Sequence, residues 1–101
     1  MLDIRTTCEN CNKALPNSSD AAMICSFECT FCKNCVDTIL HNVCPNCGGG
    51  FEKRPTRPKN CLTGSCLEKY PVSSKKVYKP VNEDTFKEIL NTFKNIEPRK
   101  R

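Results

Sequence analysis

The sequence predicts a small α+β fold that depends on bound metal ions, and three observations lead to this class. The chain has 101 residues, 38% of them hydrophobic, and that fraction includes ten cysteines. The remaining apolar residues are too few to order a chain of this length through burial alone. Eight of the ten cysteines fall in the first fifty residues, in closely spaced groups. Such spacing is typical of metal ligands in a protein that keeps its thiols reduced.

Charge and composition divide the chain into two parts. Residues 1–50 hold three basic and five acidic side chains, a net charge of −2, whereas residues 51–101 hold thirteen basic and six acidic ones, a net charge of +7. Five of the seven prolines also lie in the second part, and Pro55 and Pro58 favour extended backbone. From these differences we predict a chain of four regions. They are a head at residues 1–52, a basic extended linker at 53–81, an amphipathic helix at 82–97 and a basic terminus at 98–101.

The head cysteines form four pairs whose members lie three or four residues apart. In chain order the pairs are Cys8 and Cys11, Cys25 and Cys29, Cys32 and Cys35, and Cys44 and Cys47. A turn of this length can point both sulfurs at one tetrahedral ion, so four pairs predict two sites of four cysteines, each holding a Zn²⁺ ion. An iron–sulfur cluster is one alternative, because the central run followed by Cys44-Pro45 is similar to a ferredoxin pattern. A disulfide framework is the other.

A short helix is predicted between the third and fourth pairs. Four apolar residues repeat there at helical spacing and form one stripe: Val36, Ile39, Leu40 and Val43. Its expected packing partners are the apolar residues around the central cysteines, with a further aromatic closing the head: Met23, Ile24, Phe27, Phe31 and Phe51. His41 shares the polar side of this helix with Asp37, so we expect a solvated histidine and no metal ligand.

The order of these ligands resembles a RING finger with cysteine at the fourth position. The resemblance includes Phe31 before Cys32, the short helix after Cys35 and the closing Cys44-Pro45-Asn46-Cys47. It implies a RING-like or treble-clef head in which ligand pairs one and three share one ion and pairs two and four share the other. The implied ligand sets are Cys8, Cys11, Cys32 and Cys35 for the first site, and Cys25, Cys29, Cys44 and Cys47 for the second.

A narrower resemblance covers about four-fifths of the chain. The stretches 24–32 and 44–49, with the proline-containing stretches 54–58 and 70–80, are similar to short bacterial proteins grouped as domain of unknown function 1272. This resemblance implies a bacterial cytoplasmic protein and gives no activity. The RING resemblance implies a ubiquitin ligase, but ligases usually place an apolar residue between the first two ligands and often a basic one after the eighth. Here those places hold Glu9-Asn10 and Gly48.

The second part of the chain carries two further features. Cys61 and Cys66 lie outside the eight paired cysteines of the head, and we expect them to be spare thiols. The next alternative is a local disulfide formed on oxidation, which would make them a possible redox pair. The last alternative is a third metal site between two chains. An amphipathic helix begins at the N-cap Asn82 and stops at Pro98. Its apolar stripe faces either this protein's own head or a partner: Phe86, Ile89, Leu90, Phe93 and Ile96.

Together these features predict a structural-zinc binding or adaptor module that mediates protein–protein interaction and is not an enzyme. Four cysteines fill a zinc ion's coordination and leave no place for an activated water. The sequence has no membrane-spanning apolar stretch and no signal-peptide pattern, so we expect a cytoplasmic monomer or weak dimer. Nucleic-acid binding through the basic tail is the alternative, less favoured because two zinc–thiolate sites make the head more negative. We expect that charge to attract the tail and largely neutralise it within the chain.

Overall fold

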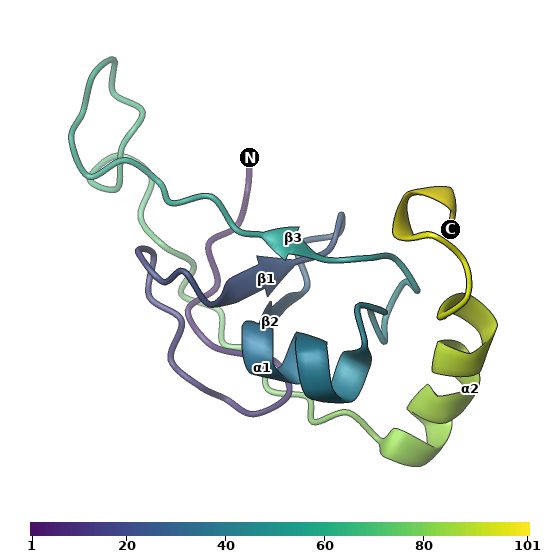
Figure 1. The fold of residues 1–101 in the computed structure, drawn as a ribbon. Coiled ribbons are helices and arrows are strands. Elements are labelled where there is room, and N and C mark those ends of the chain that lie inside the picture. The colour runs from purple at the N-terminus through teal and green to yellow at the C-terminus, as the bar shows by residue number, and fades with distance from the viewer.

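A computed structural model describes residues 1–101, and its centre is a three-stranded antiparallel sheet (Figure 1). The middle strand is β1 (Ala22–Ile24), with β2 (Thr30–Cys32) on one side and β3 (Glu52–Lys53) on the other. Ile24 lies opposite Thr30 in β2 and opposite Glu52 in β3. β1 and β2 form a hairpin, so the intervening turn carries Cys25 and Cys29 at the end of the sheet.

A short helix follows β2 without a break. It consists of α1 (Lys33–Cys35), which continues into the wider turn of η1 (Val36–Leu40). The Sγ atom of Cys32 caps it by accepting a hydrogen bond from the Cys35 N–H at 3.4 Å. His41, with a left-handed φ of 48°, ends it. The predicted short helix is confirmed over Val36–Leu40, with Val36 and Leu40 buried, but the inclusion of Val43 is wrong because the helix has already ended; Val43 is buried from the following turn.

The core is a single cluster of fourteen buried residues that includes six of the head cysteines. Phe31 and Phe51 pack edge to face at its centre, with ring centroids 5.5 Å apart. Both were expected in the core, and His41 is exposed as expected. The expectation for Phe27 is wrong, because its side chain is 71% exposed. Phe27 lies in the turn between Cys25 and Cys29, where its N–H faces the Cys25 sulfur.

The C-terminal helix α2 (Glu83–Phe93) is shorter than the predicted 82–97. Asn82 is its N-cap and accepts hydrogen bonds from the N–H groups of the first turn. A turn follows Phe93, and Pro98 opens a separate one-turn helix, η2 (Pro98–Lys100). The prediction that Ile96 belongs to the apolar stripe is therefore wrong, and its side chain is 38% exposed.

The remaining four stripe residues meet the head. Phe86 belongs to the core cluster at 4% exposure, and Ile89, Leu90 and Phe93 are partly buried against the same cluster. Figure 1 shows α2 beside the head, at the opposite end of the molecule from the long loop that follows β3. The helix is thus a part of the head's packing.

Residues 54–81 form no helix or strand. The predicted boundary at residue 52 falls inside β3, and Arg54 beyond it is buried. Cys61 and Cys66 are joined by a disulfide, with Cα atoms 5.0 Å apart, so the prediction of spare thiols is wrong for this structure. A hydrogen bond from the Leu67 N–H to the Pro58 carbonyl closes the surrounding loop and brings the two cysteines together.

The predicted neutralisation of the basic tail depends on the negative charge of two zinc–thiolate sites and stays a prediction; the direct ion pairs between tail and head are few. A single ion pair, between Arg99 and Glu52, joins a basic residue of the tail to a carboxylate of the head. Three tail arginines donate to head carbonyl groups instead: Arg54, Arg57 and Arg101. No helix of the structure has the length and apolar character needed to cross a bilayer.

Candidate metal centre

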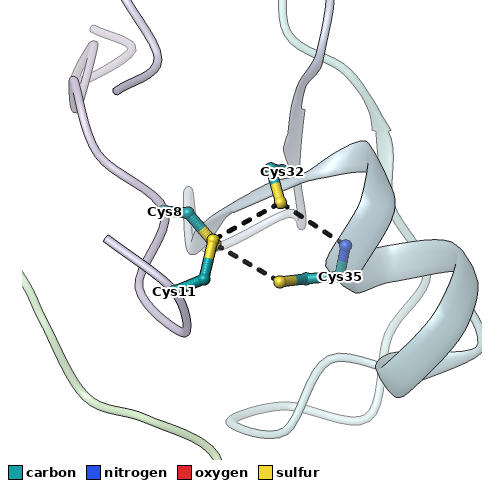
Figure 2. Close-up of side chains that lie close together, drawn as sticks. All are labelled: Cys8, Cys11, Cys32 and Cys35. Carbon is teal, nitrogen blue, oxygen red and sulfur yellow. Dashed lines mark hydrogen bonds between the residues drawn. The ribbon is translucent and has the colours of Figure 1, made fainter. Parts of the chain in front are cut away.

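The first cysteine group brings together two pairs that lie more than twenty residues apart. The sulfurs of Cys8, Cys11, Cys32 and Cys35 all lie within 4.8 Å of one another. Figure 2 shows the four side chains converging from the N-terminal loop and from the start of α1. The Sγ atoms of Cys8 and Cys35 are 3.9 Å apart, and those of Cys11 and Cys32 are 3.7 Å apart.

These separations match a tetrahedral zinc site. With metal–sulfur bonds of about 2.3 Å, the sulfurs at the corners of a tetrahedron lie about 3.8 Å apart. Cys8, Cys32 and Cys35 are buried, while Cys11 is exposed. An all-sulfur tetrahedron suits zinc or iron and does not suit magnesium or calcium, which take oxygen ligands. The donor set and its spacing therefore fit the ion that the sequence predicts.

The local backbone explains how the first cysteine pair is held. In the first pair, the Asn12 N–H donates to the Cys8 carbonyl, and the Cys8 N–H donates to the Lys13 carbonyl. Asn12 takes a left-handed φ of 62°, which asparagine tolerates, so the chain reverses directly after Cys11. Thr7 and Ala14 then pair as an isolated bridge and close the loop.

The second group lies between the hairpin turn and the loop after η1. The sulfurs of Cys25, Cys44 and Cys47 are mutually within 4.8 Å, and Cys29 lies beside them without belonging to that mutual set. Gly48 follows Cys47 with a φ of 77° and returns its N–H to the Cys44 carbonyl. The cysteines thus form a cross-brace pattern, with pairs one and three in one group and pairs two and four in the other.

In the second group, neighbouring thiols shift one another's pKa values in opposite directions. A hydrogen bond from Cys44 lowers the pKa of Cys29 to about 5, while burial raises the pKa of Cys25 to about 11. The same hydrogen bond and burial raise the pKa of Cys44. Without a cation, one thiolate in the group is favoured and its neighbours stay protonated, because like charges at this distance repel. A dication removes that repulsion.

Two asparagines donate their side-chain amides to sulfurs, one in each group. The Asn10 Nδ2 atom lies 3.3 Å from Cys35 Sγ, and the Asn46 Nδ2 atom lies 3.4 Å from Cys29 Sγ. Such donors stabilise the charged thiolate and fix the orientation of the ligand. Neither role was predicted from the sequence. Their only signal is position, since each asparagine lies between the two cysteines of a pair.

Glu9 also lies between two cysteines of a pair, and its carboxylate is engaged in contacts within the head. Its carboxylate accepts a hydrogen bond from the Thr30 N–H at 2.8 Å and forms an ion pair with Arg5 at 3.3 Å. Its side chain is almost fully buried, and this burial raises the pKa of the Glu9 carboxyl above its usual range. Glu9 therefore ties the first cysteine pair to β2 and presents no carboxylate to solvent.

A small α+β head with two cysteine groups in a cross-brace pattern defines a cysteine-rich protein that can hold two metal ions. Residues 1–57 match the family described as "Protein of unknown function (DUF1272)", and the chain belongs to it.

The chain is also similar to "Uncharacterized protein R02474" of Rhizobium meliloti (strain 1021). The two are 51% identical over 80 residues, which are 79% of this chain and 89% of the relative. No solved structure matches the chain.

Proposed function

We propose that this protein is a structural zinc module of the bacterial cytoplasm that acts by binding another protein and catalyses no reaction. One Zn²⁺ would be held by the first group, and a second by Cys25, Cys29, Cys44 and Cys47. The observation that carries the proposal is the first group itself, whose sulfur separations of 3.7 and 3.9 Å fit a zinc tetrahedron. Zinc bound in this way supplies folding free energy and cross-links loops that have few apolar contacts.

The arrangement of elements supports a treble-clef head. A cysteine-bearing turn, a β-hairpin and a helix that begins at a third cysteine pair follow one another around the first group. Four sulfur ligands leave no open position on the metal, so the proposed role is structural. Phe27, 71% exposed at the tip of the hairpin, is an aromatic side chain available to a protein partner.

The test is metal analysis of protein purified without chelator. We expect two zinc ions per chain, a colourless solution and loss of structure when a strong chelator removes the metal. One ion or none would contradict the proposal, and a brown protein with broad visible absorbance would assign the sites to iron. As a control, the disulfide variant Cys61→Ser/Cys66→Ser should retain both ions, because those cysteines lie outside both groups.

Nucleic-acid binding is a second candidate, favoured by one specific surface. Lys75, Lys76 and Lys79 form no ion pair, and Tyr78 between them is 58% exposed. Lysines beside an exposed aromatic ring can bind phosphates while the ring stacks on a base. If this candidate holds, affinity for single-stranded DNA or RNA should fall steeply with salt, and Tyr78→Ala should weaken it. Salt-independent or undetectable binding would exclude it.

The structure offers little support for ubiquitin-ligase activity. The residues between the first two ligands are already engaged, because Glu9 is buried and the Asn10 amide contacts Cys35 and the tail. The tail lies against this loop through a hydrogen bond from the Lys79 N–H to the Glu9 carbonyl. We therefore do not propose ligase activity.

A further inference from the structure

The C-terminal arm, residues 79–101, contacts both cysteine groups. At the first group, the Lys79 N–H donates to the Glu9 carbonyl at 2.7 Å, and the Val81 N–H donates to Asn10 Oδ1 at 2.8 Å. The other end of the Asn10 amide donates to Cys35 Sγ at 3.3 Å. One side chain thus links the arm directly to a sulfur of the first group.

At the second group, the contact is a ring packed on a turn. A Cβ atom added to Gly48, the residue after Cys47, would lie 2.8 Å from the Phe93 ring. The Arg101 guanidinium donates to the carbonyls of Asn42 and Gly48 near the same turn. Pro45 and Asn46 line a cleft together with Phe86 of α2.

The arm contacts the loops that carry the first and fourth cysteine pairs, and these loops contain almost no regular structure. A bound dication would fix all four sulfurs of a group in place and would therefore fix the loops that the arm contacts. The Asn10 amide donates to Cys35 Sγ, so fixing that sulfur in place also limits the movement of the amide. The Asn10 amide is then held with its oxygen directed toward the Val81 N–H.

We infer that metal binding and docking of the arm form one linked equilibrium, so that loss of metal releases α2 and exposes its apolar stripe. The inference rests on the proposed zinc function and concerns how that site is regulated. Linkage is reciprocal: if the metal stabilises the docked arm, the docked arm raises the affinity for metal by the same factor. The released stripe carries Phe86, Ile89, Leu90 and Phe93.

The test perturbs the arm and measures the metal. In the full-length zinc-loaded protein, Phe86→Asp places a charge in a site that is 4% exposed and should undock α2. Competition with a chelating dye of known affinity should then show a zinc dissociation constant raised about five-fold or more. Lys87→Ala, at the exposed neighbouring position of α2, should leave the constant unchanged.

A second variant changes the head and leaves the arm intact. Asn10→Ala removes the amide that joins Cys35 to Val81 and leaves every cysteine in place. We expect it to weaken zinc binding and to increase hydrogen exchange across residues 83–93 of the loaded protein. Asn34→Ala, an exposed position in α1, is its control.

The outcomes separate the two proposals. Zinc bound at wild-type affinity in both Phe86→Asp and Asn10→Ala would overturn the linkage and leave the zinc function intact. Protected α2 amides after zinc removal would also overturn it. Failure of the wild-type protein to bind zinc would overturn the proposed function itself, and the linkage with it.

Discussion

Replacement of Gly48 by alanine tests whether the packing of Phe93 on the second cysteine turn contributes to stability. Gly48 has a φ of 77°, and an added Cβ would lie 2.8 to 3.0 Å from three atoms of the Phe93 ring. The left-handed backbone alone should cost alanine about 1–2 kcal/mol. Displacement of the packed ring should add about 1–3 kcal/mol, the usual cost of overpacking. We therefore expect Gly48→Ala to destabilise the zinc-loaded protein by about 2–5 kcal/mol.

Gly64 provides a matched control. Its φ is 85°, close to that of Gly48, but an added Cβ would meet nothing within 4 Å. Gly64→Ala should therefore show the backbone strain without the steric clash, a loss of about 1–2 kcal/mol. The difference between the two variants isolates the contact with Phe93.

The assay is urea unfolding of zinc-saturated protein, evaluated as a double-mutant cycle with Phe93→Ala. Once the ring is removed, Gly48→Ala should cost no more than Gly64→Ala, which gives a coupling of about 1–3 kcal/mol. Equal losses for the two glycine variants, or additive losses in the cycle, would show that Phe93 does not rest on this turn.

Four further outcomes are expected. Arg54→Met should destabilise the protein by about 2–5 kcal/mol in the same assay, because the buried guanidinium donates to the carbonyls of Arg5, Leu15 and Pro16 and its removal leaves them unpaired; a loss below about 1 kcal/mol would contradict this. Cys61→Ser/Cys66→Ser should cost about 2 kcal/mol from the small loop that the disulfide closes, and no change would mean that the bond is not formed in solution. Phe27→Ser should change stability by less than about 0.5 kcal/mol, since the ring is exposed. Burial raises the pKa of Cys25 to about 11, so zinc binding at pH 7 should release its proton and strengthen as pH rises; calorimetry in two buffers would detect no proton release if this is wrong.

The elements that the sequence predicted well are those set by local spacing. Each cysteine pair spans one turn, so its approximate geometry follows from the interval between its members. The helix after Cys35 was likewise visible as a stripe, since Val36 and Leu40 lie one helical turn apart on the buried face. The cross-brace pattern came from the family resemblance, because spacing alone also allowed pairing in sequence order.

The errors arise where distant contacts or helix ends decide the outcome. The apolar spacing continued to Ile96, yet a turn after Phe93 removes that residue from the helix face, and no glycine marks the stop. Phe27 was expected to pack on the short helix because it is an apolar residue among the central cysteines, although the turn between Cys25 and Cys29 directs it outward. The roles of Asn10 and Arg54 depend on contacts as far as 71 residues apart in the chain, which composition and periodicity do not encode.

The contacts by which the tail docks on the head determine which of its basic side chains can still bind an anionic partner. Arginines such as Arg57 and Arg101 donate to neutral carbonyl groups of the head, and neither forms an ion pair, so these hydrogen bonds add no negative charge beside them. The apolar contacts of Phe86 supply docking that salt should hardly affect, because hydrophobic burial is not screened. The basic surface around Tyr78 is therefore available to an anionic partner while the arm stays docked, and the two binding proposals do not compete for the same residues.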